Sequence, residues 1–279
     1  MVRKNRIAAK FAELRNRGEA ALIPFIFAGD PSLDQTLSLV QELEARGADL
    51  LELGVPFSDP MADGPANQRA GARALAAGAS LPAILDLVGE IRRQSEIPIV
   101  LFGYFNPFLR YGCDRLCADA AHAGADGLLA VDLPPEENAE LRRPARRAGL
   151  DLIYLLAPTT PLERSRRIAR MASGFLYYVS ITGVTGSPAA LGPELRRRID
   201  ELRPFVSLPI GVGFGISTPE QARDVASYAD AVVVGSALSR LLETHGASTA
   251  GIATVGELVS AMKRAMWDAR KAAVGGSAG

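Results

Sequence analysis

An acidic side chain interrupts one of the most apolar segments of this sequence. Glu52 lies in the run Leu50-Leu-Glu-Leu53, near the end of a segment that is typical of a buried strand. A buried carboxyl group without a partner is costly in its charged form, so burial raises its pKa toward neutrality, where it can act as a general acid or base. A glutamate paired with an arginine or with backbone donors is the alternative, and the local sequence leaves both interpretations open.

A second candidate acid, Asp63, lies in the loop that follows this segment. The loop from Gly54 to Pro65 is long and rich in Pro, Asp and Gly, so Asp63 either forms a turn or reaches back toward a ligand. Asp132 ends another apolar run and is a further acid at a strand end. Asp30, immediately before Pro31, is more typical of a turn or a helix cap.

Three loops near the C-terminal half carry glycines that could contact a phosphate group. They are Gly183-Val-Thr-Gly186, Gly213-Phe-Gly215 and Gly235-Ser236, and each follows an apolar run. Glycine lets the backbone approach an anion closely, and backbone N–H groups at a helix N-terminus bind phosphate. Ser236 stands where an N-cap hydroxyl would be available. Each loop alone could be only a tight turn, but together they predict a phosphate site.

Aromatic side chains occur near the same ends of the apolar runs. A flat, apolar part of a substrate could pack among them, although filling of the protein interior is the simpler explanation, above all for Phe102. These aromatic residues are Phe25, Phe102, Tyr104, Tyr177 and Phe214.

Several classes of reaction are disfavoured because the apolar runs lack lysine and histidine. All four lysines lie near the termini, so neither a Schiff-base lysine nor a lysine-bound pyridoxal phosphate is expected. His122 and His245 lie away from the strand ends, which argues against a histidine-ligated metal. What remains is carboxylate chemistry on a phosphorylated or otherwise polar small molecule.

The elements that must position these residues repeat one unit. Short apolar runs alternate with longer amphipathic segments, as in βαβ units of a parallel sheet. Eight such units match a closed (β/α)8 TIM barrel of the α/β class, formed as a single domain of 279 residues. An open doubly wound sheet is the alternative, and the absence of a GxGxxG motif after the first run weakens it. The predicted strands span 22–29, 48–55, 97–104, 125–132, 150–158, 174–180, 208–215 and 229–236.

Two terminal segments add to this barrel. Residues Arg3 to Arg17 predict an extra amphipathic N-terminal helix, whose Ile7, Phe11 and Leu14 could close the barrel bottom. Residues 274–279 predict a disordered tail.

The composition narrows the class of protein and its partners. A formal net charge of zero and 48% hydrophobic residues favour neither nucleic acid nor an anionic membrane as a partner. The first apolar stretch, 20–28, is too short to span a bilayer and follows a charged segment, so it is neither an anchor nor a signal peptide. Cys113 and Cys117 are expected to be reduced packing residues. The prediction is a soluble cytoplasmic protein.

Four blocks of this sequence, in order, resemble the tryptophan synthase alpha subunit family. The most specific block is Leu51-Glu-Leu-Gly-Val-Pro-Phe-Ser-Asp-Pro-Met-Ala-Asp-Gly-Pro65, and the resemblance runs from about Phe11 to Trp267. The supporting blocks are Pro24-Phe-Ile-Phe-Ala-Gly-Asp-Pro31, Gly183-Val-Thr-Gly186 and Gly213-Phe-Gly-Ile-Ser217.

The resemblance implies a lyase that cleaves indole-3-glycerol phosphate into indole and glyceraldehyde 3-phosphate. It implies that Glu52 is the acid–base catalyst and that Asp63 accepts a hydrogen bond from the indole N–H. Tyr177 would lie close to the catalytic glutamate, and Phe25 and Phe214 would line the indole pocket.

The resemblance also implies a phosphate site and a protein partner. It implies no cofactor in this chain, with pyridoxal phosphate only in a separate beta subunit that receives the indole, in an alpha2-beta2 heterotetramer. Phosphate would be bound by Gly186, Gly215, Gly235 and Ser236, with Thr185 in the loop that closes over the site.

The sequence departs from the family pattern at Phe27, at Asn67 and in the segment 187–192. Phe27 stands where a threonine is common, and Asn67 where an aliphatic residue is usual. Three other interpretations stay open: a stand-alone lyase without a beta partner, a non-catalytic phosphate-binding barrel, and another phosphate barrel such as an epimerase or flavin oxidoreductase.

Overall fold

The strands form one parallel sheet that closes on itself. The computed structural model describes residues 5–180, 193–213 and 215–275, with side chains up to residue 269. Neighbouring strands follow the order β5-β4-β3-β2-β1-β9-β8-β7-β6. The strands are β1 (Ala21–Phe27), β2 (Leu51–Gly54), β3 (Ile99–Gly103), β4 (Gly127–Ala130), β5 (Asp151–Leu152), β6 (Tyr154–Leu156), β7 (Leu176–Val179), β8 (Ile210–Gly213) and β9 (Ala231–Val234).

The two edge strands of this order are halves of a single run, and this closes the barrel. β5 pairs with β4 and β6 pairs with β7, while the intervening Ile153 donates its N–H to the carbonyl oxygen of Leu128 at 3.0 Å. The predicted fifth strand is therefore one strand shared by both ends of the sheet. This confirms the predicted (β/α)8 barrel and excludes the open doubly wound sheet.

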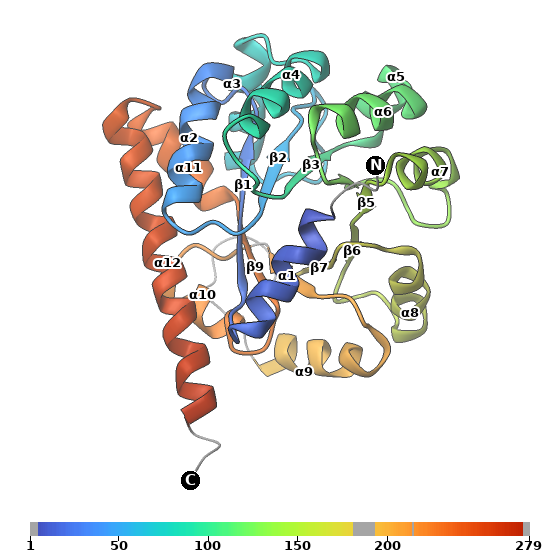
Figure 1. The fold of residues 1–279 in the computed structure, drawn as a ribbon, viewed down its shortest axis with the longest axis vertical. Helices are drawn as coiled ribbons and strands as arrows, with labels where there is room; N and C mark the ends of the chain where they lie inside the picture. The colour runs from blue at the N-terminus through green and yellow to red at the C-terminus, as the bar shows by residue number, and fades with distance from the viewer. Residues whose placement is uncertain (1–4, 181–192, 214, 276–279) are drawn as a thin grey trace.

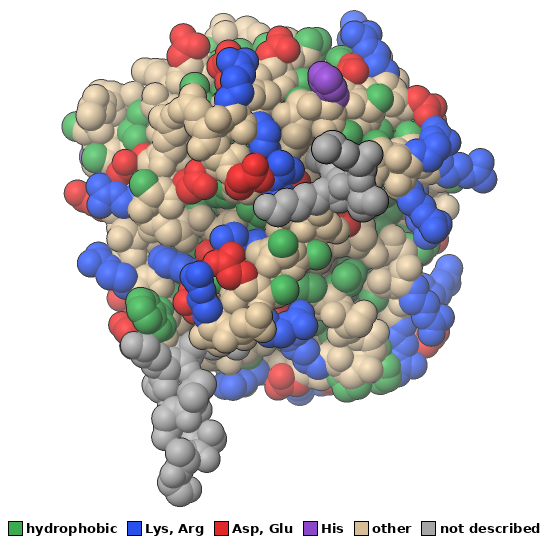
Figure 2. All heavy atoms as spheres, viewed as in Figure 1, with side chains coloured by type: hydrophobic (Ala, Val, Ile, Leu, Met, Phe, Trp, Pro, Cys, Tyr) green, Lys and Arg blue, Asp and Glu red, His purple; other side chains and the backbone are tan. Residues whose placement is uncertain are grey.

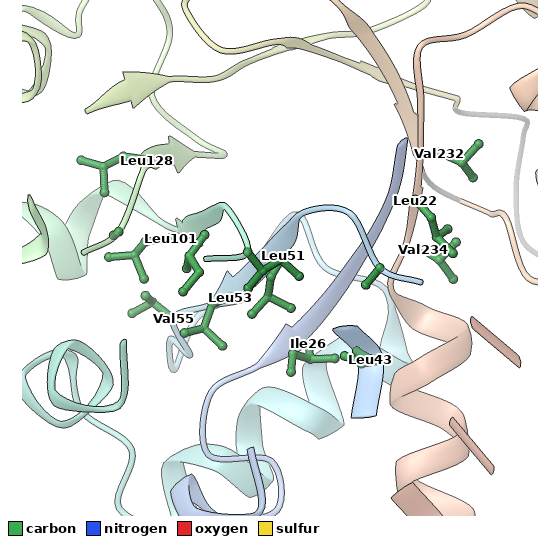
Figure 3. Packing of buried hydrophobic residues seen from close by; sticks show 14 of the residues in the cluster. Leu22, Ile26, Leu43, Leu51, Leu53, Val55, Leu101, Leu128, Val232 and Val234 are labelled. Carbon is green, nitrogen blue, oxygen red and sulfur yellow. The ribbon is translucent and has the colours of Figure 1, made fainter. Parts of the chain in front are cut away.

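Alternate residues of each strand face the barrel interior or the surrounding helices. On β1, Ile23 and Phe25 belong to the inner apolar cluster, whereas Leu22 and Ile26 pack in the outer one. In the outer cluster, Leu43 of α2 lies beside Ile26 (Figure 3). Both faces are apolar because helices cover the outside and side chains fill the inside.

Helices surround the barrel (Figure 1). The long α12 packs against α10, α11 and α2, and it continues to Gly275, so residues 274 and 275 are helical rather than part of the predicted tail. The helices are α1 (Arg6–Asn16), α2 (Leu33–Ala45), α3 (Pro65–Ala76), α4 (Leu81–Arg92), α5 (Phe105–Tyr111), α6 (Cys113–Ala123), α7 (Ala139–Ala148), α8 (Leu162–Met171), α9 (Pro193–Leu202), the short 3-10 helix η1 (Arg203–Phe205), α10 (Pro219–Ala226), α11 (Ser236–His245) and α12 (Thr249–Gly275).

The predicted N-terminal helix is present and covers the end of the barrel where the strands begin. It starts at Arg6, after Asn5, whose side chain accepts a hydrogen bond from the N–H of Ala8 at 2.9 Å. The apolar face of α1 joins the inner cluster, and the ring of Phe11 lies 5.8 Å from that of Phe175. In Figure 1 this helix crosses the middle of the barrel. It therefore closes the bottom, as expected.

Three aspartates at this same end carry out one structural task. Asp49, Asp126 and Asp230 each come just before a strand and accept a hydrogen bond from the first or second residue of a neighbouring strand. Each also pairs with a cation. The repeated Ala-Asp sequence thus locks adjacent strands together, beyond the turn that we predicted from it.

Acidic and basic side chains are interspersed on the face of the molecule that Figure 2 shows. No single helix in the described part of the chain is long and apolar enough to cross a membrane; only α3 and α4 taken together, bent by 94°, have the length and composition. Cys113 and Cys117 are free thiols buried on α6.

Candidate active site

Glu52 faces into the barrel from β2. It lies in register with Phe25 of β1 and Val100 of β3, and its side chain is completely buried. Neither carboxyl oxygen has a hydrogen-bond partner among the described residues. Burial raises the pKa of Glu52 to about 8, since nothing in its surroundings compensates the charged form. The sequence left a paired glutamate open; in the described structure the carboxyl group is unpaired.

The Glu52 carboxyl group opens onto a pocket at the end of the barrel opposite α1. The pocket encloses about 620 Å³, including its open mouth, and it contains both predicted acids. Its walls come from β1, β2, β3, β7 and β9 and from the loops or helix starts that follow β2, β8 and β9. The lining residues are Phe25, Glu52, Asp63, Gly64, Asn67, Phe102, Tyr177, Gly215, Ile216, Val233, Gly235 and Ser236.

Asp63 is held at the rim of the pocket by groups distant in sequence. The Tyr104 hydroxyl donates to Asp63 Oδ2 at 3.1 Å and accepts from the N–H of Ala62 at 2.9 Å. Burial raises the pKa of Asp63, while hydrogen bonds from Tyr104 and Asn67 act in the opposite direction and favour its charged form. The two acids of the pocket therefore differ: Glu52 has no partner in the part of the chain that the structure describes, whereas Asp63 is held by donors.

Aromatic rings flank Glu52 where glycines leave room for them. Phe25 meets both Phe27 and Phe102 edge-on at 5.0 Å between ring centroids. The Tyr177 phenol covers Gly213 so closely that a Cβ there would lie 2.1 Å from the hydroxyl oxygen. Burial, and after it the charge of Glu52, raises the pKa of Tyr177 well above its ordinary value. Tyr177 therefore stays a neutral hydroxyl close to Glu52.

The predicted phosphate residues that the structure describes all line this pocket. Gly235 immediately precedes α11, and Ser236 is its first residue. A Cβ at Gly235 would lie 3.1 Å from the Phe25 ring, and Gly215 has a φ of +80°, which favours glycine. A helix N-terminus facing a pocket is suited to an anion. The predicted Thr185, Gly186 and Phe214 lie outside the described residues.

Some residues of the site were missed from the sequence, and two other acids have structural tasks. Ile216 lines the pocket, and no local pattern marks it as functional; Asn67, noted from the sequence only as a departure from the family pattern, lines it too. Asp132 accepts the N–H of Phe105 at 2.7 Å, at the start of α5. Asp30, which we expected to form only a turn or cap, is buried and ion-paired with Arg73.

The arrangement suits proton transfer beside an anion. A carboxyl group with a pKa of about 8 can both give and take a proton near neutral pH. Among the described residues, no group of three or more His, Cys, Asp or Glu side chains is placed to hold a metal ion.

The family model described as "Tryptophan synthase alpha chain" matches residues 11–267, which include every described residue of the pocket. The chain belongs to the tryptophan synthase alpha chain family. It is 55% identical over 260 residues to the tryptophan synthase alpha chain of Geobacter sp. (strain M21), covering 93% of this chain and 97% of that one. The relative from Geobacter sulfurreducens is 52% identical over 262 residues, covering 94% and 99%.

Solved structures of the family have the same barrel. The crystal structure of tryptophan synthase subunit alpha from Legionella pneumophila str. Paris has a TM-score of 0.88 at 42% identity, covering 95% of this chain and 100% of that one. A structure of Mycobacterium tuberculosis tryptophan synthase gives 0.85 at 33% identity, covering 95% and 99%.

Membership of this family gives the reaction. The tryptophan synthase alpha chain is a lyase of tryptophan biosynthesis that cleaves indole-3-glycerol phosphate. The family further implies a beta-subunit partner and no cofactor in the alpha subunit.

Proposed function

We propose that Glu52 is the acid–base catalyst of indole-3-glycerol phosphate cleavage. The unpaired, completely buried carboxyl group carries this proposal, because it is protonated at neutral pH and opens onto the pocket. Glu52 donates its proton to C3 of the indole ring, which gives a cationic indolenine. The resulting carboxylate accepts the proton of the substrate hydroxyl on the carbon attached to C3. The bond between this carbon and C3 breaks in the same step. Indole and an aldehyde leave, and Glu52 is protonated again.

Asp63 stabilises the positive charge that this sequence places on the ring nitrogen. Hydrogen bonds from Tyr104 and Asn67 favour its charged form, and an ionised carboxylate accepts the indole N–H. Since the ring carries positive charge only after protonation at C3, this contact is strongest in the transition state. The heterocycle is the electron sink, so the mechanism needs neither a lysine nor a metal.

The substrate phosphate binds at the N-terminus of α11, in the same pocket as the two acids. Gly235 and Ser236 lie at this N-terminus, and Gly215 lies beside them in the pocket wall. Phe25 and Tyr177 pack against the indole ring. Thr185, Gly186 and Phe214 stay predictions from the sequence for the same site.

A beta subunit accepts the indole product. We propose an alpha2-beta2 heterotetramer in the cytoplasm, with pyridoxal phosphate in the beta subunit and no cofactor in this chain; family membership supports this. A stand-alone lyase would use the same pocket. Adding a purified beta subunit distinguishes the two, because a large rise in the rate of indole release is expected only for an alpha chain of the complex.

The test of the proposed function is release of indole and glyceraldehyde 3-phosphate from indole-3-glycerol phosphate. Glu52→Gln keeps the shape of the side chain but cannot exchange a proton, so cleavage is abolished while calorimetry still detects substrate binding. Glu163→Gln, on an α8 side chain that is 75% exposed, is the matched control and keeps the wild-type rate. Substantial turnover by Glu52→Gln removes Glu52 from this role.

A further inference from the structure

Helices α3 and α11 are joined by polar contacts on consecutive turns. The Ser239 hydroxyl donates to Asn67 Oδ1 at 3.0 Å, and one turn further along α11 Glu243 accepts two hydrogen bonds from Arg69, at 2.6 and 2.9 Å. Helix α3 begins two residues after Asp63, and α11 begins at Ser236 in the pocket wall. The contacts therefore connect the segment that carries Asp63 to the helix proposed to bind phosphate.

Among the residues that join α3 to α11, Asn67 also lines the pocket. Ser239 is buried and does not line the pocket, whereas Asn67 lines it together with Asp63. A side-chain amide has an acceptor oxygen and a donor nitrogen, so contact of Oδ1 with Ser239 leaves the NH2 group for another acceptor. The Asp63 carboxylate lines the same pocket, and its interaction with Asn67 favours its charged form.

We propose that Asn67 is a positioning residue for Asp63, fixed by Ser239, that couples the aspartate to helix α11. This inference rests on the proposed function of Asp63. The order of donation is Ser239 hydroxyl to Asn67 oxygen, then Asn67 nitrogen to Asp63 oxygen. An aliphatic side chain at position 67 could make neither contact. The asparagine at position 67, where the family usually has an aliphatic residue, thus serves to position Asp63.

Asp63 then receives donors from two directions. Tyr104 donates from the end of β3, and Asn67 donates from the first turn of α3. Donors to a carboxylate stabilise the charged form, which opposes the effect of burial. Loss of the Asn67 donor should therefore raise the pH at which Asp63 becomes ionised.

The experiment compares Asn67→Leu, which is close to isosteric, with Ser239→Ala, which removes only the hydroxyl that fixes Asn67. We expect Asn67→Leu to lower kcat about tenfold at neutral pH, the loss of one hydrogen bond to a charged group. The acidic limb of its kcat profile should move to higher pH, with little change in KM. Ser239→Ala should shift the limb in the same direction by less, and the double variant should be no worse than Asn67→Leu.

A matched control separates positioning from general destabilisation. Ser165→Ala removes another buried helix hydroxyl, which donates to the Pro161 carbonyl at 3.1 Å outside the pocket, and it should leave the pH profile unchanged. An unshifted acidic limb in both Asn67→Leu and Ser239→Ala overturns the proposal. A shift in Asn67→Leu alone also overturns it, because Asn67 would then act without Ser239.

Titration of the Asp63 carboxyl group tests the proposal without an activity assay. Carbon-13 NMR of aspartate-labelled protein, assigned with Asp63→Asn, should show that Asp63 ionises at higher pH in Asn67→Leu than in the wild type. If the wild type releases no indole, the proposed function fails while this titration still decides the positioning contact. An unchanged Asp63 titration contradicts the contact even when the enzyme is active.

Discussion

The two ends of the barrel both contain buried carboxyl groups, but they treat them in opposite ways. At the end covered by α1, Asp126 is 5% exposed, accepts the N–H of Ile99 at 2.9 Å, and pairs with Arg6 and Arg92 at 3.1 Å each. At the open end, Glu52 is completely buried and neither oxygen has a partner in the described structure. Burial of an acid therefore does not by itself distinguish the proposed catalyst, whereas the lack of a partner among the described residues does.

This difference has a physical basis. A carboxylate that accepts backbone donors and pairs with arginine is stabilised as an ion and joins the elements that supply those groups. A carboxyl group without such groups keeps its proton near neutral pH and lowers the stability of the fold once it must ionise. The covered end stabilises the barrel, and the open end keeps a proton available for chemistry.

The largest effect that sharpens the comparison is expected at Asp63, the acid at the rim of the open end. Asp63→Asn removes the charge that stabilises the protonated ring, and we expect kcat to fall by about two to four decades. The measurement is steady-state release of glyceraldehyde 3-phosphate, and substrate binding should change much less than kcat. A variant that retains more than a tenth of the wild-type kcat would show that the charge of Asp63 is not used.

The next effect is the pH dependence of unfolding that Glu52 causes. The folded pKa of about 8 lies above the ordinary glutamate value of 4.5, so the folded protein binds more protons than the unfolded chain between these pH values. The free energy of unfolding therefore falls as pH rises. Relative to Glu52→Gln, the wild type should lose about 1.4 kcal/mol per pH unit in this window, on the order of 3 kcal/mol between pH 5 and 7. Urea unfolding at several pH values measures it.

A surface variant controls this second prediction. Glu163→Gln, on the exposed side of α8, should keep the wild-type slope. Equal slopes for the wild type and Glu52→Gln would contradict a buried, unpaired Glu52.

A smaller effect is expected at the covered end. Asp126→Asn removes a buried charge, and we expect the free energy of unfolding to fall by about 2 kcal/mol. This is less than the usual cost of breaking a buried ion pair, because Arg92 keeps carbonyl acceptors on Ser95 and Gly124. Activity per folded molecule should stay at the wild-type level. Thermal unfolding and the indole assay on the same sample check both, and a selective loss of activity would break the distinction between the two ends.

The sequence was sufficient for the features that depend on local pattern. Continuous apolar runs predict buried parallel strands, and eight of them predict a barrel, because each run is covered on both faces. Glu52 could be predicted for the same reason: it is a charged residue in the middle of such a run. The sharing of one run by β5 and β6 could not, since it depends on how the sheet closes.

The parts of the site that escaped prediction depend on contacts between distant segments. Tyr104 and Asp63 are 41 residues apart, and Ser239 and Asn67 are 172 apart, so no spacing rule brings either pair together. The ion pair between Arg73 and Asp30 escaped for the same reason, with 43 residues between them. Resemblance to the family supplied the proposed role of Asp63. The role proposed for Asn67 could be inferred only from its contacts in the structure.

We propose above all that Glu52 holds a proton at neutral pH because no described residue pairs with it. The most direct measurement is carbon-13 NMR of protein labelled at the glutamate carboxyl carbons, titrated with pH and assigned with Glu52→Gln. The account predicts one resonance, absent from the variant, that stays protonated at pH 7 and titrates at about 8. A Glu52 resonance that is already ionised at pH 6 would contradict it.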